Sequence, residues 1–235
     1  MATQVEEKAS TLKDKDGVSA QDVGVTPTAD IPGRIETERL VLRQLQEEDF
    51  ESIATLYGNE DVARNISFLE GRARSRETAR RFFDWFRSQQ TEPRKTKDVY
   101  DFAITDRKGY FIGHTMLFYH QEDDRDIFER VIYLSPQYWK QGYATETQRA
   151  LMEFGFGKLG LQKIYATAAL DNVGSQLEQV RSGMVPGGQK DVQMGQTGVT
   201  RNSLYFESTP NVWAKFKQEN IQAQQAVQGM RFTAG

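Results

Sequence analysis

Apolar positions in the first half of the chain follow two different spacings. Residues 47–57 and 75–89 place apolar side chains three and four positions apart, which predicts two amphipathic helices. Ser75 is a suitable N-cap for the second helix, whose buried side is crowded with the aromatic residues Phe82, Phe83, Trp85 and Phe86. Residues 39–43 have polar ends around an apolar centre, which predicts a buried strand.

The middle of the chain has the spacing of β-structure. Residues 101–105 and 110–119 predict a hairpin, because the turn-forming sequence Asp106-Arg107-Lys108-Gly109 joins them. Residues 130–134 predict a further strand that stops near Pro136.

Helix and strand then alternate. Residues 145–159 predict a helix closed by Gly160, and residues 163–170 predict a strand. A short helix at 174–182 and a last strand at 202–207 follow. This order of elements predicts an α+β fold in which helices surround a mixed sheet.

Composition separates both ends of the chain from this pattern. Residues 1–33 are small and polar and end in Pro-Gly, so we expect a disordered N-terminal tail. Residues 218–235 are rich in Gln and Ala and predict a peripheral helix or a C-terminal tail. The domain is therefore expected to span residues 34–217.

Composition and charge also exclude several classes of protein. The 235 residues contain no cysteine, which excludes a disulfide framework and a cysteine nucleophile. A net charge of −3 gives no basic field that would indicate nucleic acid. No apolar run approaches the roughly 20 residues of a membrane span. We therefore expect a cytoplasmic protein with neither nucleic-acid nor membrane partners. His114 and His120 have no ligand set nearby, so we expect them to pack or hydrogen-bond and expect no metal site.

The segment 136–146, Pro-Gln-Tyr-Trp-Lys-Gln-Gly-Tyr-Ala-Thr-Glu, follows a predicted strand and opens a predicted helix. Gly142 and Ala144 allow the backbone to come close to a ligand. The free N–H groups of the first helical turn and the helix dipole both favour an anion such as phosphate. An ordinary strand-to-helix turn that contains a glycine is the alternative interpretation.

Four segments, taken in order, resemble the GNAT superfamily of N-acetyltransferases, and within it the ribosomal-protein N-terminal acetyltransferases of the RimJ/RimL type. They are residues 35–50, the loop 138–146, the strand and asparagine loop 160–172, and the segment from Ser175 to Gly183-Met184. The resemblance spans about residues 34–213. It implies the GNAT fold, a mixed and mostly antiparallel central sheet with splayed parallel strands, flanked by helices.

The resemblance also implies that acetyl-CoA is the co-substrate. Its pyrophosphate would be held by the loop Lys140, Gln141, Gly142, Tyr143, Ala144 and Thr145. Its pantetheine arm would pair with the open strand edge Val131, Ile132, Tyr133 and Leu134. Asn172 would face the same arm and Ser175 would lie near the thioester. Alternatively, Asn172 is a turn residue and Ser175 is part of a helix start.

Transfer to an amine requires a group that takes a proton from the ammonium. Glu129 precedes the strand that leads into the loop, where members of the family often have a glutamate, and we expect it to be the catalytic base. The alternative is a solvated carboxylate paired with Arg130 or Arg125. Gln179 replaces the tyrosine that many GNAT enzymes have, which leaves Ser175 or a water to protonate the departing thiolate.

The sequence therefore predicts an acyltransferase that moves an acetyl group from acetyl-CoA to a primary amine by direct attack in a ternary complex. The acceptor is expected to be a protein N-terminus or a small-molecule amine, and the protein a monomer or homodimer. The alternative is a non-catalytic acyl-CoA-binding or sensing module, which Gln179 favours and Glu129, Asn172 and Ser175 oppose.

Overall fold

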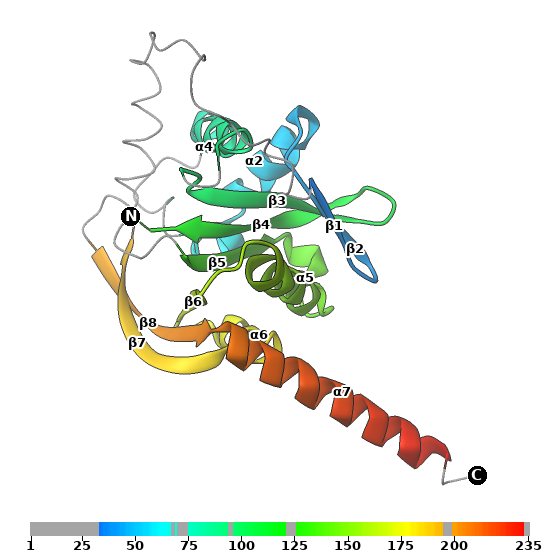
Figure 1. The fold of residues 1–235 in the computed structure, drawn as a ribbon. Coiled ribbons are helices and arrows are strands. Elements are labelled where there is room, and N and C mark those ends of the chain that lie inside the picture. Colours follow the sequence, from blue (N-terminus) through cyan, green and yellow to red (C-terminus); the bar gives the residue numbers. More distant parts are fainter. Residues whose placement is uncertain are drawn as a thin grey trace, which may run out of the picture.

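The computed structural model describes residues 33–66, 69, 75–93, 96–120, 126–194 and 199–232. The predicted N-terminal tail, apart from Gly33, lies outside the described residues. Strands of the described part form one sheet in the order β1-β2-β3-β4-β5-β6-β8-β7 (Figure 1). Their bounds are β1 (Arg34–Glu36), β2 (Leu40–Arg43), β3 (Val99–Asp106), β4 (Phe111–Tyr119), β5 (Ile127–Leu134), β6 (Lys163–Ala169), β7 (Val185–Met194) and β8 (Val199–Ser208).

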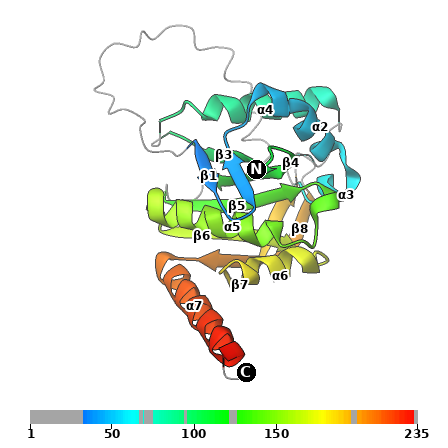
Figure 2. The same ribbon diagram turned by 90° about the vertical axis from the view of Figure 1, so that its right-hand side faces the viewer.

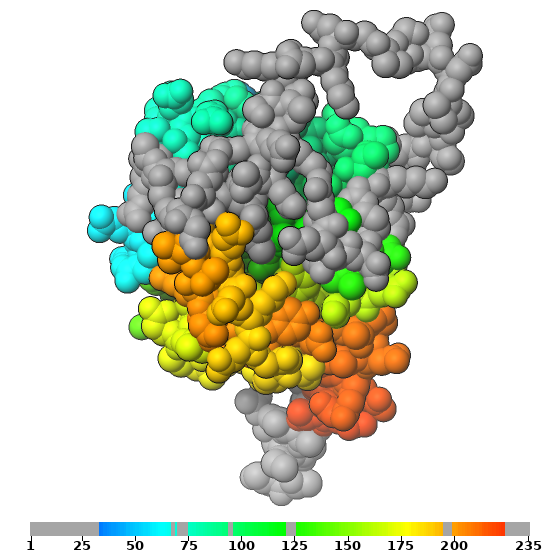
Figure 3. Space-filling model, turned by 90° about the vertical axis from the view of Figure 1, so that its left-hand side faces the viewer, coloured from blue at the N-terminus to red at the C-terminus, as the bar shows by residue number. Residues whose placement is uncertain are grey.

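Neighbouring strands pair antiparallel everywhere except between β5 and β6, which are parallel. The predicted mixed, mostly antiparallel sheet with one parallel pair is confirmed. At one end of the sheet, β7 and β8 form a curved hairpin that makes a broad surface below α4 (Figure 3).

Helices cover both faces of the sheet (Figure 2). One face carries α2 (Phe50–Gly58), α3 (Glu60–Ala63) and α4 (Arg76–Gln89). The other carries α5 (Tyr143–Glu153) and α6 (Val173–Arg181), and α7 (Pro210–Phe232) leads away from β8. Each face has its own apolar core, one built around Phe83, Phe86 and Met116, the other around Leu117, Leu151 and Ile164.

Two local predictions are confirmed by the contacts that form them. Ser75 caps α4, because its Oγ accepts the backbone N–H of Thr78 at 3.1 Å. The β3–β4 hairpin closes through Gly109, whose φ of 92° lies in the left-handed region that glycine adopts without strain. Burial of Phe83 and Phe86 then fixes the α4 face that packs on the sheet.

Several elements differ from the sequence prediction. Strand β8 begins at Val199, α7 begins at Pro210, and α3 was not predicted. Strand β5 begins three residues early, at Ile127, and the predicted helix 145–159 begins at Tyr143 and becomes a π-helical turn from Phe154 to Lys158. Strand β7 was not predicted. Its first seven residues are exposed and include Pro186 and two glycines, so it lacks an alternating apolar face.

The long helix α7 is anchored at its first turns. Trp213 is buried, its ring packs over Gly183, and its indole N–H donates to Glu153 at 2.9 Å. Lys217 donates to the same Glu153 oxygen at 2.8 Å. Glu153 therefore joins the end of α5 to α7. Among the helices described, none is both long and apolar enough to cross a membrane.

Gly183 should be sensitive to a single added methyl group. Its φ is 97°, and a Cβ there would lie 2.8 Å from the Trp213 ring. Gly183→Ala should therefore lower the free energy of unfolding by roughly 1–3 kcal/mol, measured by chemical denaturation. Gly58→Ala is the matched control, because a Cβ at Gly58 meets nothing within 4 Å. Equal stability of the two variants would contradict this packing of α7.

Candidate active site

Strands β5 and β6 separate after a short parallel register. Their pairs are Ile127 with Lys163, Phe128 with Ile164 and Glu129 with Tyr165. Beyond this point β5 stays paired with β4 up to Leu134, while β6 pairs with β8 up to Ala169. The edge of β5 that includes Val131, Ile132, Tyr133 and Leu134 therefore turns toward a widening gap, and its backbone groups have no β6 partner.

The N-terminus of α5 follows directly after this open edge. The chain passes through a 3-10 turn (Pro136–Tyr138) and a loop in which Lys140 and Gly142 have φ values of 59° and 80°. Glu146 is the first residue whose backbone N–H bonds back, to the Gly142 carbonyl at 3.1 Å. The N–H groups of Tyr143, Ala144 and Thr145 thus lie in the first turn, where an α-helix offers donors and a positive dipole end. The predicted strand–loop–helix arrangement of an anion site is present.

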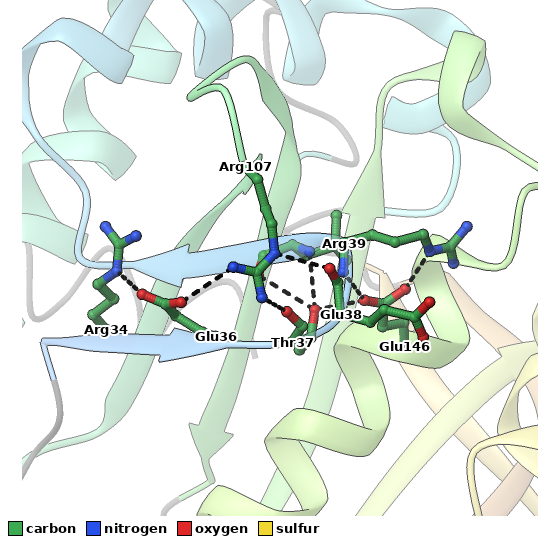
Figure 4. Close-up of polar contacts among 8 residues, drawn as sticks. Arg34, Glu36, Thr37, Glu38, Arg39, Arg107 and Glu146 are labelled. Carbon is green, nitrogen blue, oxygen red and sulfur yellow. Dashed lines mark hydrogen bonds and ion pairs between the residues drawn. The ribbon is translucent and has the colours of Figure 1, made fainter.

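Arg39 and Glu146 bind the β1–β2 turn to this loop (Figure 4). The Arg39 guanidinium donates to Glu146 Oε2 at 2.6 Å and to the Gln141 carbonyl at 2.9 Å, and it lies 4.4 Å from the centre of the Tyr143 ring. Glu146 Oε1 accepts from the Arg39 backbone at 2.8 Å and from the Thr37 hydroxyl at 2.5 Å. Partial burial raises the pKa of Glu146, but these hydrogen bonds outweigh burial and hold it below its usual value. The carboxylate is therefore ionised at neutral pH.

Glu129 lies at the last paired position before the strands separate. It is 9% exposed. Its Oε2 is 2.7 Å from His120 Nε2, and its Oε1 accepts from the Thr167 hydroxyl at 3.1 Å. Thr167 is on β6, two residues beyond the last β5–β6 pair, so the carboxylate leans across the start of the gap. The alternative interpretation of Glu129, a solvated surface carboxylate, does not agree with this burial.

The polar groups on the face of the sheet beneath α2 and α4 are buried. Tyr57 and His114 share a hydrogen bond of 2.8 Å between the phenol oxygen and Nδ1. Tyr133 packs against Tyr57, with ring centres 5.9 Å apart. Burial and the nearby Glu129 carboxylate raise the pKa of Tyr133, so its phenol stays neutral. As predicted, both histidines form hydrogen bonds. Among the described residues no group of three or more His, Asp or Glu could hold a metal ion.

The opposite face of β5 carries a buried cation. Arg130 is 2% exposed and donates to Ser182 Oγ at 2.8 Å and to Gln179 Oε1. Burial lowers the pKa of Arg130 to about 10, and Glu178, 3.8 Å away, opposes this shift. Burial likewise raises the pKa of Glu178. Gln179 Nε2 is 3.4 Å from Ser175 Oγ. This chain of contacts joins β5 to the start of α6.

Asn172 caps α6, since its Oδ1 accepts the Ser175 backbone N–H at 3.1 Å. Its Nδ2 donates to Asn65 at 3.3 Å. Asn172 and Ser175 therefore both take part in the start of α6. The Ser175 hydroxyl is half-buried beside Gln179. The structure brings the open β5 edge, the α5 N-terminus and the α6 start around the same gap. Glu129 points to the opposite face of β5, away from Arg130, Gln179 and Ser182.

Several contacts at this site were not predicted from the sequence, namely those of Arg39, His120, Arg130 and Thr167. One signal was available for Arg39. A carboxylate in the first turn of a helix, such as Glu146, repels an anion bound there, so a neighbouring cation is required.

Comparisons with known proteins identify the family. The family model for the acetyltransferase (GNAT) domain matches residues 39–185. The chain therefore belongs to the GNAT acetyltransferases. It is 28% identical over 176 residues to the uncharacterized N-acetyltransferase YoaA of Bacillus subtilis (strain 168), covering 75% of this chain and 90% of that protein.

Solved structures share the fold. A putative ribosomal-protein-serine acetyltransferase from Vibrio cholerae has a TM-score of 0.62 at 19% identity, covering 75% of this chain and 97% of that one. Spermidine N-acetyltransferase from Vibrio cholerae, in complex with CoA and spermine, has a TM-score of 0.62 at 18% identity, covering 76% and 99%. At these identities the likeness establishes the GNAT fold.

Proposed function

We propose that this chain is an acetyl-CoA-dependent N-acetyltransferase that acetylates a primary amine by direct attack in a ternary complex. The observation that carries the proposal is the gap between β5 and β6, which opens at a buried carboxylate and ends beside a helix N-terminus. The gap offers backbone donors and acceptors, the helix offers an anion site, and the carboxylate offers a base.

The residues present fit acetyl-CoA. Lys140 through Thr145 would hold the pyrophosphate with backbone N–H groups, and Val131 through Leu134 would bind the pantetheine arm and polarise the thioester carbonyl. The N–H groups of Tyr143, Ala144 and Thr145 precede the first helical hydrogen bond, from Glu146 to the Gly142 carbonyl, and this supports an anion at the start of α5.

Glu129 is proposed as the base, because an ammonium must lose a proton before its nitrogen can attack. Its carboxylate is buried, is held from two sides, and lies where the strands begin to separate. Arg130 does not neutralise it, since adjacent residues of a strand point to opposite faces.

Ser175 is proposed to donate a proton to the departing thiolate. The guanidinium of Arg130 can only donate, so it fixes the Gln179 amide with Oε1 toward itself and Nε2 toward Ser175. The Ser175 oxygen then accepts from Gln179, and its own hydrogen is available for the sulfur. Gln179 thus serves as a positioning residue at the place where many GNAT enzymes have a tyrosine.

The acceptor is proposed to be a protein N-terminus, as in the RimJ/RimL branch, or a small amine. Structural neighbours with both kinds of name share the fold, so the fold does not separate the two. Thiol release from acetyl-CoA, measured against a panel of polyamines and N-terminal peptides, tests the function. Acetyl-CoA binding without thiol release on any amine would instead support the non-catalytic binding module.

The contact between Arg39 and Glu146 should matter for binding. Arg39→Met removes the guanidinium that joins Glu146 to Gln141 and leaves the stem of the side chain. We expect the Kd for acetyl-CoA to rise roughly three- to tenfold, by up to about 1.4 kcal/mol, in a calorimetric titration. Arg34→Met is the control, because the ion pair that the described residues give Arg34 is a local one with Glu36. Unchanged affinity in Arg39→Met would place the pyrophosphate elsewhere.

Replacement of the base should affect turnover and not binding. Glu129→Gln should lower kcat by about 10²–10⁴-fold near neutral pH, because a positioned base contributes this much. The defect should shrink as the pH rises, since the acceptor amine then loses its proton to solvent. The Kd for acetyl-CoA should stay within twofold. Full activity of Glu129→Gln at neutral pH would remove Glu129 from the mechanism.

Loss of the Ser175 hydroxyl should slow thiolate departure. Ser175→Ala should lower kcat by about tenfold or more with a nearly unchanged Kd for acetyl-CoA, in keeping with the loss of a general acid. Leu177→Ala, at an exposed position on the same helix, is the control. Equal kcat values for the two variants would assign the proton to water.

A further inference from the structure

The proposed base has a titratable partner that the mechanism above does not use. His120, at the end of β4, is 7% exposed, and its Nε2 lies 2.7 Å from Glu129 Oε2. The imidazole ring is held by Phe118, with ring centres 4.8 Å apart, and by Tyr165, 6.0 Å away. Because these rings limit its rotation, the contact with Glu129 is a fixed feature of the site.

The chemistry of the contact sets where the protons lie. An ionised carboxylate only accepts, so the nitrogen that faces it must carry a hydrogen. A neutral His120 is therefore the Nε2–H tautomer, and any further proton on the ring goes to Nδ1. This is the relation in which a carboxylate orients an imidazole and stabilises the imidazolium that forms.

Charged and titratable groups reach this region from several described elements. Lys97 lies just before β3, beside the end of β4, and its buried ammonium donates to the Gln89 carbonyl. Glu129 faces the His120 ring from β5 and the Tyr165 phenol from β6. Lys190, on β7, lies 5.2 Å from the centre of the Tyr165 ring, on which it forms a cation–π contact. Arg130 points to the opposite face of β5. An imidazolium at His120 would thus have Glu129 as its direct counter-ion.

We propose that His120 positions the Glu129 carboxylate as the proton acceptor for the acceptor ammonium. When an N–H bond of the ammonium breaks, its electron pair stays on nitrogen for attack on the acetyl carbon, and the proton goes to the Glu129 carboxylate, whose Oε2 keeps the hydrogen bond donated by His120 Nε2–H. His120 is a positioning residue that works through Glu129. Its Nε2–H donates to the carboxylate and holds it where β5 and β6 begin to separate. This inference rests on the proposed function.

The test uses His120→Phe, which keeps a ring beside Phe118 and Tyr165 but removes the hydrogen bond to Glu129. We expect kcat to fall about tenfold or more at neutral pH with an unchanged Kd for acetyl-CoA. The fall of kcat/KM on the acid side of the pH profile should move to higher pH, because the carboxylate loses a hydrogen-bond donor. His120→Gln is the matched control, because its amide can still donate to Glu129 and should recover most of the activity.

A double variant tests whether His120 and Glu129 contribute to kcat together or independently. If His120 acts through Glu129, His120→Phe combined with Glu129→Gln should be no slower than Glu129→Gln alone. Defects that multiply, or a His120→Phe enzyme with the wild-type pH profile, would overturn the proposal while the acetyltransferase function stands.

A second measurement does not depend on activity. The chain has two histidines, so His120→Gln assigns their nitrogen NMR signals. In the wild type the His120 signal should show the Nε2–H tautomer with slow exchange of that hydrogen, and this signature should be lost in Glu129→Leu, which has no acceptor. A His120 signal that is the same in both proteins would refute the pair. A wild type that shows the signature but releases no thiol with any amine would refute the proposed function alone.

Discussion

The parallel contact between β5 and β6 extends over only three residue pairs, and the candidate site depends on this limit. Each strand is held elsewhere, β5 by seven pairs with β4 and β6 by six pairs with β8. The separation therefore costs the sheet little, because both strands keep one full ladder. It still leaves backbone donors and acceptors along the inner edges that need partners. A ligand with amide groups meets that need better than a side chain does, which agrees with the proposed place of the pantetheine arm.

The loop beside the gap shows how the proposed anion site can have an acidic residue in its own first helical turn. Glu146 alone would weaken phosphate binding at the α5 N-terminus. Its charge is instead taken up by Arg39 and Thr37, which lie between β1 and β2. The same guanidinium holds the Gln141 carbonyl, so the backbone N–H groups that follow keep a fixed direction. The same contacts therefore neutralise Glu146 and position the loop. They are made by the β1–β2 turn, which is far from the loop in sequence.

Features that depend on neighbouring residues could be predicted from the sequence. Contacts that depend on how the strands pair could not. The α4 cap, the β3–β4 hairpin and the strand–loop–helix around Gly142 each follow from neighbouring residues, and each is confirmed. Strand β7 has no alternating apolar face, so no periodicity signals it. The contacts of Arg39 with Glu146 and of Arg130 with Gln179 join residues 107 and 49 positions apart, so only the folded sheet shows them. The contact between His120 and Glu129 likewise needs the β4–β5 pairing.

The alternation of side chains along β5 explains how the proposed base and a cation can be neighbours in sequence without cancelling each other. Glu129 and Arg130 would form an ion pair if they shared a face, and the carboxylate would then be a poor proton acceptor. The period of two sends Glu129 toward His120 and Thr167, and sends Arg130 toward Gln179 and Ser182. Proton removal from the amine and proton supply to the thiolate are opposite tasks, and they need environments of opposite charge. Strand β5 therefore keeps the environments of Glu129 and Arg130 on opposite faces of the sheet, and the gap along its edge lies next to both.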